Sequence, residues 1–194
     1  MPPPSAEPPA ALKPSRHSVL LLLLKMQLAY VFLALVWGFL RGISWWKALH
    51  WNLGLVGGAA LGLGLAFISH RLFEGLSRQF ESVRWLREEC MGPIARVLSP
   101  GGKLMVALAS GFGEEVLFRG ILLTELGLVP SSLLFALLHL GDRRMVWMAG
   151  WAFLTGLLMG GLVLLTGNLA LAVVIHICNN YASFWLLHKT GARS

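Results

Sequence analysis

Residues 104–123 read LMVALASGFGEEVLFRGILL, an apolar stretch long enough for a transmembrane helix that carries three charges in its second half. The charged residues are Glu114, Glu115 and Arg119. Placing a carboxylate or a guanidinium in hydrocarbon is costly unless the group is paired or faces a wet cavity. Charges kept at this depth are typical of an ion path, a proton relay or a catalytic site. This stretch is therefore the first candidate for a functional site.

The composition indicates an integral membrane protein. Of the 194 residues, 56% are hydrophobic and only 13% are charged, too few to form the polar surface of a soluble domain. We expect an all-α, polytopic bundle of about six transmembrane segments. Their approximate bounds are 18–40, 51–69, 104–123, 128–140, 145–166 and 169–187. The fourth is short for a full span, so it must be tilted, re-entrant or extended backward.

The remaining segments differ from these six. Residues 1–17 are rich in proline and predict a disordered tail, followed by a single membrane domain over 18–194. The stretch 70–103 has mixed charge and a Gly92-Pro93 break, which predicts an amphipathic connector at the cytoplasmic membrane surface. Cys90 lies in this polar stretch and Cys178 in an apolar one, so no disulfide is expected. Glycines in the second and fifth apolar segments predict close helix packing.

The basic residues orient the bundle. If the N-terminus is cytoplasmic, the far side holds only Arg41 and Lys47, whereas most other Lys and Arg residues lie on the cytoplasmic side. The positive-inside rule then predicts that both termini are cytoplasmic. The short chain and its arginine-rich loops favour a multi-pass protein of a prokaryotic inner membrane. The basic residues form no stripe with interleaved aromatics, so the expected partner is the lipid bilayer and not nucleic acid.

Residue spacing separates the two glutamates. Glu115 and Arg119 are four residues apart, so they share a helix face and are predicted to form an ion pair. Glu114 points about 100° away and has no obvious partner on its own helix. This arrangement predicts one structural carboxylate, Glu115, and one carboxylate that does the chemistry, Glu114.

Three other polar residues in apolar segments can join Glu114. His176 and Asn180 are four apart in the sixth segment and share a face, whereas Asn179 is turned away and is a weaker candidate. Glu114 and His176 lie at similar depths when counted from the cytoplasmic ends of their helices. His139 lies near the cytoplasmic mouth, and it joins them if its helix tilts or the loop 141–144 dips.

The residue types narrow the chemistry of hydrolysis within a membrane. Ser110-Gly111 lacks the glycine that usually stands two residues before a catalytic serine, because Leu108 occupies that position. Asp142 is the only aspartate, which excludes a two-aspartate site, and no His-Glu-x-x-His motif is present. What remains is a glutamate acting as general base.

Two mechanisms use the remaining residues. In the first, Glu114 takes a proton from water, His139 orients that water, and His176 and Asn180 donate hydrogen bonds to the oxyanion. In the second, Glu114, His139 and His176 hold a catalytic zinc ion, since a His₂Glu set leaves a fourth position for water. The spacing of the residues does not separate these two mechanisms.

Three motifs occur in order on apolar segments: Glu114-Glu115-x-x-x-Arg119, Phe135-x-x-x-His139 and His176-x-x-x-Asn180. The ordered set, over roughly residues 104–187, resembles the CAAX protease and bacteriocin-processing (CPBP/Abi) family of glutamic-type intramembrane endopeptidases. The resemblance implies that Glu114 activates water, His139 is its partner, and His176 and Asn180 bind the oxyanion. Glu115 and Arg119 match supporting positions. It favours a mechanism without a cofactor, with zinc as the alternative.

The implied activity is hydrolysis of a peptide bond near the membrane in a membrane-anchored or lipidated protein or peptide. CAAX-like processing, peptide maturation, bacteriocin self-immunity and removal of C-terminal sorting signals all stay open. Two other classes of membrane protein also keep charged and polar residues within apolar segments: a small proton-coupled transporter and a non-catalytic membrane scaffold. A transporter usually has an inverted repeat, whereas here the deep ionisable residues all lie in the second half. A scaffold would be indifferent to Glu114→Gln.

Overall fold

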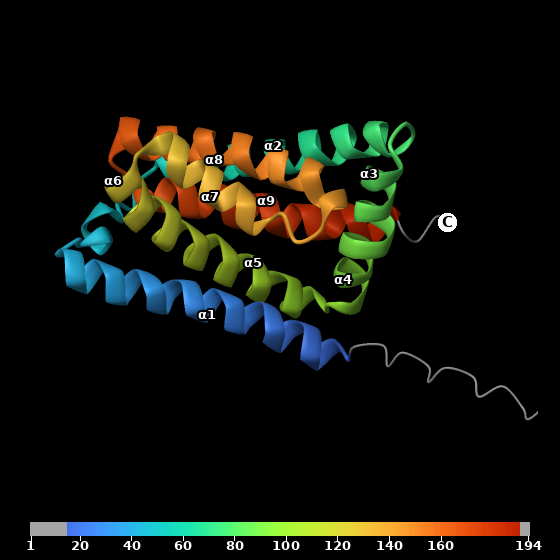
Figure 1. Ribbon diagram of the computed structural model, residues 1–194, viewed down its shortest axis with the longest axis horizontal. Coiled ribbons are helices and arrows are strands. Elements are labelled where there is room, and N and C mark those ends of the chain that lie inside the picture. Colours follow the sequence, from blue (N-terminus) through green and yellow to red (C-terminus); the bar gives the residue numbers. More distant parts are fainter. Residues whose placement is uncertain (1–14, 191–194) are drawn as a thin grey trace, which may run out of the picture.

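The computed structural model describes residues 15–190, and over this range the chain is helical and contains no strand. The long helices lie side by side along the longest dimension of the molecule (Figure 1). They are α1 (Arg16–Arg41), α2 (Gly54–Ser77), α5 (Pro100–Glu115), α7 (Leu128–Leu138), α8 (Val146–Thr166) and α9 (Leu169–Thr190). Short helices connect or extend them: η1 (Trp45–Ala48), α3 (Glu81–Trp85), η2 (Leu86–Met91), α4 (Gly92–Val97), η3 (Val116–Leu122), α6 (Leu123–Leu126) and η4 (Arg143–Met145). The predicted all-α fold is confirmed.

Four stretches of the described chain are long and apolar enough to cross a membrane: α1, α2, η4 with α8, and α9. The helix α7 has 11 residues and covers about 17 Å, less than the roughly 30 Å of a hydrocarbon core. The charged stretch 104–123 lies in α5, η3 and α6, which follow one another without a break from Pro100 to Leu126. The chain is a multi-pass membrane protein, and the count of about six spans stays a prediction.

The first helix starts earlier than expected. The hydroxyl of Ser15 accepts a hydrogen bond from the backbone N–H of Ser18 (3.2 Å), so Ser15 caps α1 and the helix begins at Arg16. Most of the predicted tail over 1–17 lies outside the described residues. The far end of α1 stops at Gly42, whose φ of +69° is the left-handed conformation that glycine adopts readily.

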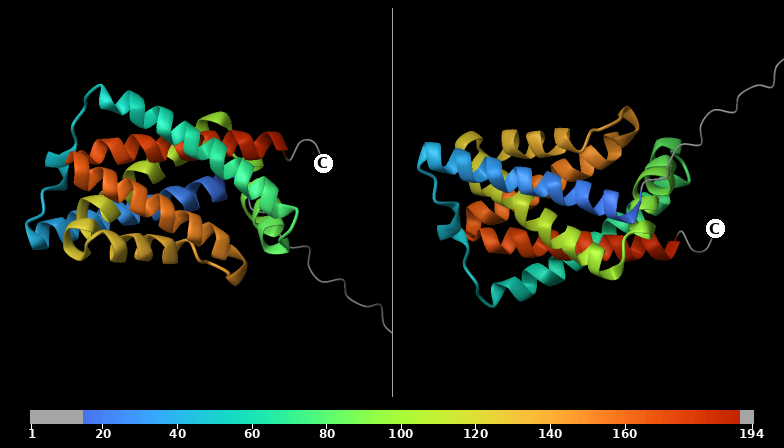
Figure 2. Two further views of the ribbon diagram at one scale, coloured as in Figure 1. Left: turned by 90° about the horizontal axis from the view of Figure 1, so that it is seen from above. Right: turned by 90° about the horizontal axis from the view of Figure 1, so that it is seen from below.

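The connector is more helical than predicted. The helix α2 continues to Ser77, beyond the expected end of its apolar segment, and α3, η2 and α4 follow it. Pro93 does not interrupt the helical connector, because it lies in the first turn of α4, where a missing backbone N–H costs little. The connector lies at the same end of the bundle as the start of α1 and the end of α9 (Figure 2). Cys90 and Cys178 are both free, as predicted.

Glycines bring α9 close to its two main neighbours, α2 and α5. A methyl group added at Gly62 of α2 would collide with the backbone carbonyl of Ile175, and one at Gly111 of α5 would collide with Ile177. Gly64, on another face of α2, has no atom near its missing side chain. The predicted glycine packing is therefore confirmed at Gly62 but does not extend to every glycine of that segment.

The end of the bundle opposite the connector is held by polar contacts. The amide of Asn168 donates to the carbonyl of His50 (2.9 Å) and accepts from the N–H of the same residue (3.1 Å). The Asn168 side chain also accepts from the N–H of Ala170 at the start of α9 (3.0 Å). Arg41 and Glu125 form an ion pair (3.1 Å) between the ends of α1 and α6. These contacts fix the loops at this end.

We expect Gly62→Ala and Gly64→Ala to change stability in opposite directions. Alanine at position 62 must push α2 away from α9, so its thermal midpoint in detergent should fall, with a loss of roughly 1–3 kcal/mol. Alanine at position 64 meets open space and gains helix propensity of up to about 1 kcal/mol. Circular dichroism during heating measures both. Equal shifts for the two variants would contradict the close contact at Gly62.

Candidate functional site

The site is organised around the fully buried carboxylate of Glu115. Its Oε1 accepts hydrogen bonds from Nη1 of Arg119 (2.9 Å) and from Nδ1 of His176 (2.7 Å). The predicted Glu115–Arg119 ion pair is therefore present. The contact with His176 was not predicted, and it links the end of α5 to the middle of α9. The guanidinium of Arg119 also lies over the ring of Phe135 in α7 (4.5 Å). The ion pair on the α5–η3 run therefore contacts two other helices, α7 and α9.

Glu114 is also buried, but only one of its oxygens is used. Its Oε1 accepts a hydrogen bond from Nε2 of Gln27 (3.0 Å), on α1. Its Oε2 has no hydrogen-bond partner and lies 3.8 Å from Nε2 of His176. The expected similar depth of Glu114 and His176 is thus observed. The sequence reasoning missed Gln27, although an amide in an otherwise apolar segment was a signal for it.

His139 stands at the end of α7, one helical turn from Phe135. Its Nδ1 hydrogen-bonds with the carbonyl of Phe135 (2.8 Å), and its ring packs on the Phe135 ring with centroids 4.6 Å apart. The same Phe135 ring meets His176 edge-on at 6.2 Å. His139 and His176 line the same small cavity, so α7 brings His139 to the site, and Phe135 contacts both imidazoles.

Asn180 faces α5, as its spacing from His176 predicts. Its Nδ2 donates to the hydroxyl of Ser110 (2.9 Å), and its Oδ1 accepts from Nδ2 of Asn179 (3.2 Å). The Oδ1 atom of Asn179 is buried and has no hydrogen-bond partner. Asn179, the weaker candidate from the sequence, is therefore part of the polar cluster.

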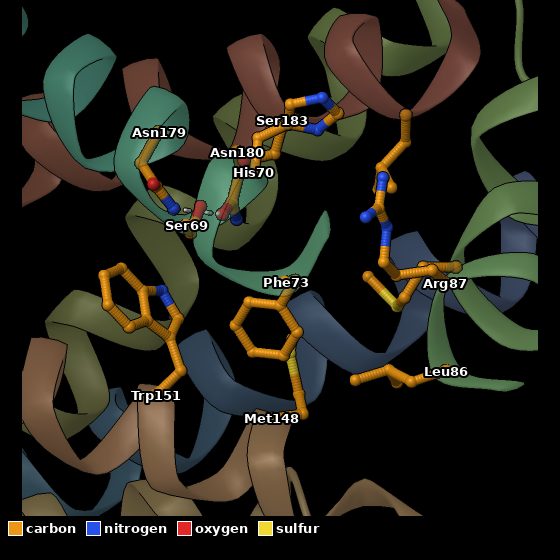
Figure 3. Close-up of a pocket in the computed structure, with 12 residues that line it drawn as sticks. Ser69, His70, Phe73, Leu86, Arg87, Met148, Trp151, Asn179, Asn180 and Ser183 are labelled. Carbon is orange, nitrogen blue, oxygen red and sulfur yellow. Dashed lines mark hydrogen bonds between the residues drawn. The ribbon is translucent and has the colours of Figure 1, made fainter. Parts of the chain in front are cut away.

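Two adjoining cavities meet at this cluster. The inner one, of about 60 Å³, is lined by His139, His176 and Asn180 among others. The outer one, of about 130 Å³, extends to Leu86 and Arg87 of η2 (Figure 3). Met91 of η2 also lines it. Both are lined by Met148, Trp151, Asn179 and Asn180. The shared lining gives a route from the connector end of the bundle to the imidazoles.

The residues named for a zinc site are not arranged as ligands. Within residues 15–190, no three His, Cys, Asp or Glu side chains converge in a way that could hold a metal ion. Nδ1 of His176 is bonded to Glu115, and Nδ1 of His139 is bonded to a backbone carbonyl, so each ring has only its Nε2 atom left for a metal ion or a substrate. The choice between a mechanism with zinc and one without it stays a prediction.

Comparison with known families adds to this geometry. Residues 98–182 match the family model described as type II CAAX prenyl endopeptidase Rce1-like. The match covers a little under half of the chain. The matched stretch contains every motif residue from Glu114 to Asn180, and it excludes α1, α2 and most of the connector. No curated protein and no solved structure gives a match. The match shows that residues 98–182 are similar to membrane proteases of the CAAX type.

We expect Arg119→Ala to damage the fold more than the chemistry. It leaves the carboxylate of Glu115 buried without its cation, and breaking a buried pair in this way costs roughly 3–5 kcal/mol. The yield of folded protein and the thermal midpoint in detergent measure the effect.

Arg41→Ala is the matched control, because the Arg41 side chain is 59% exposed in its pair with Glu125. An exposed pair contributes about 0–1 kcal/mol. An Arg119→Ala protein as stable as Arg41→Ala, but slow in catalysis, would show that Arg119 takes part in the reaction.

Proposed function

We propose that this protein hydrolyses a peptide bond near the membrane surface in a membrane-anchored or lipidated substrate, with Glu114 as the general base. The observation that carries this proposal is the Oε2 atom of Glu114, which is buried, lacks a hydrogen-bond partner and faces His176. A buried polar atom without a partner is uncommon and marks a place for a ligand or a water molecule. The Rce1-like match supports a protease reaction at this place.

Glu114 is held for this role by Gln27. Because the Gln27 amide binds Oε1 (3.0 Å), Oε2 is the oxygen left for the nucleophilic water. As the water oxygen attacks the peptide carbonyl carbon, its proton passes to Oε2. The C–N bond then breaks as the same proton is delivered to the leaving amine nitrogen, so Glu114 acts first as base and then as acid.

His176 and Asn180 are the proposed donors to the oxyanion. Nδ1–H of His176 donates to Glu115, so its Nε2 carries a proton only in the imidazolium form. In this role the His176 imidazolium balances the charge of Glu114, as Arg119 balances that of Glu115. The buried cluster then holds two positive and two negative charges. Asn180 uses one N–H on Ser110 and has a second one available. Donors fixed in advance around a developing charge are the main source of such stabilisation.

The remaining motif residues have positioning roles in this proposal. His139 stands on the cavity wall across from His176 and orients the water or the substrate carbonyl. Glu115 and Arg119 hold His176 in place, since Glu115 bonds to both.

The substrate is expected to reach the site from the connector end, where the outer cavity lies. We propose that this end is cytoplasmic, because it gathers the basic connector and the described ends of α1 and α9 (Figure 1). The arginine-rich connector supports the further proposal that the protein lies in a prokaryotic inner membrane. CAAX-like processing fits this placement, with peptide maturation and sorting-signal removal as the other candidates.

We expect Glu114→Gln to abolish cleavage of a prenylated or otherwise membrane-anchored test peptide. A glutamine keeps the size of the side chain but cannot take the proton, so the rate should fall by about 10²–10⁴-fold. The measurement is cleavage by purified protein in detergent, followed by mass spectrometry of the products.

Glu89→Gln, an exposed carboxylate on the connector, is the control and should cleave at the wild-type rate. A chelator should leave the wild-type rate unchanged, and loss of activity that zinc restores would instead favour the metal mechanism. Equal rates for Glu114→Gln and wild type would remove Glu114 from the chemistry. No cleavage of any anchored peptide by the wild type would favour a scaffold.

A further inference from the structure

The outer cavity has two unlike walls. Ser69, Asn179, Asn180 and Ser183 gather on one side, and Phe73, Leu86, Met148 and Trp151 lie across from them (Figure 3). Phe73 and Trp151 pack edge to face with ring centroids 6.5 Å apart. An extended peptide with apolar side chains also has a polar part, its backbone, and an apolar part, its side chains. The walls therefore suit a short peptide segment.

Two basic side chains stand at the part of this cavity formed by α2 and η2. His70 extends from α2 and Arg87 from η2, and both lie beside the cavity in Figure 3. They are the two basic residues that line it among the described residues, and no carboxylate lines it. This part of the cavity therefore has a positive charge with no negative charge in its own lining.

The guanidinium of Arg87 is only weakly engaged. Its Nη1 donates one long hydrogen bond (3.4 Å) to the hydroxyl of Ser77. The neighbouring Glu74 is already paired with Arg71 (2.9 Å) and lies 3.9 Å from Arg78. A guanidinium has five N–H donors, and it matches a carboxylate with two of them at once. Arg87 thus has donors left for a ligand.

The direction of the pKa shift of Arg87 agrees with a cation that lacks a full set of partners. Burial lowers the pKa of Arg87 from its ordinary value, whereas Glu74 and Glu88 act in the opposite direction. The group stays charged at neutral pH, as arginine does in proteins. A half-buried charge of this kind gains from an anionic ligand that replaces its lost water.

We propose that Arg87, assisted by His70, binds the terminal carboxylate of the peptide substrate. The inference deepens the proposed function and rests on it: the carboxylate lies at η2, and the chain runs past Asn179 toward Glu114 and His176. Anchoring a free C-terminus sets the cleavage point at a short distance from the end of the substrate.

The test measures binding, so it does not depend on cleavage. The full chain carrying Glu114→Gln is titrated in detergent with a fluorescent peptide that ends in a prenylated cysteine and three apolar residues. A second peptide differs only in a C-terminal carboxamide. We expect the acid to bind about tenfold or more tightly than the amide, the usual size of a lost hydrogen-bonded charge contact.

Variants of Arg87 assign this preference to one side chain. Arg87→Gln should lower the affinity for the acid peptide to that for the amide peptide. The affinity for the amide peptide should not change, which also shows that the variant is folded. Arg87→Lys should keep part of the preference. Arg84→Gln, an exposed arginine one turn of the connector away, is the matched control and should keep all of it.

Equal affinities for acid and amide in the Glu114→Gln protein would overturn the proposal, and so would a preference that survives Arg87→Gln. Failure of both peptides to bind would overturn it as well. A clear acid preference together with unimpaired cleavage by Glu114→Gln would keep the carboxylate site and reject the proposed mechanism.

Discussion

The structure depends on one buried carboxylate, that of Glu115, whose charge must be compensated by hydrogen bonds and a cation. Glu115 has no exposed surface, and charged groups in a membrane protein must be compensated by other protein groups. Arg119 supplies a cation from the same helical run, and His176 supplies a donor from α9. Asn180 adds a second link between α5 and α9 through Ser110, and Gly111 lets the two helices approach this closely. Glu114, the proposed general base, thereby lies next to the imidazole of His176, which is held by Glu115.

The sequence was sufficient for features that depend on composition and short spacing. The all-helical fold follows from the apolar segments, and the Glu115–Arg119 pair follows from a separation of four residues. The contact between Glu115 and His176 spans 61 residues along the chain, so no helical periodicity predicts it. Gln27 was missed because its segment resembles a helix that faces only lipid. Pro93 was expected to break the connector, but a proline in a first turn is compatible with a helix.

The N-terminal half is more than a membrane anchor. The family match begins at residue 98, yet α1 supplies the amide that binds Glu114, and α2 supplies one wall of the outer cavity. The helix α9 is packed between α2 and α5 through glycine contacts on both sides. The matched segment therefore carries the motif residues, while helices outside it complete the surroundings in which those residues lie.

The short helix α7 has a consequence for the surrounding lipid. It ends at His139, and a polar turn with Asp142, Arg143 and Arg144 follows, with Arg144 stacked on Trp85 of α3 (3.7 Å). A helix shorter than the hydrocarbon thickness is accommodated by local thinning of the bilayer and by headgroups drawn toward its end. If α7 is one of the predicted spans, the boundary between water and lipid should dip beside His139, which lines the inner cavity. A membrane-embedded bond can in this way meet water without a long aqueous channel through the protein.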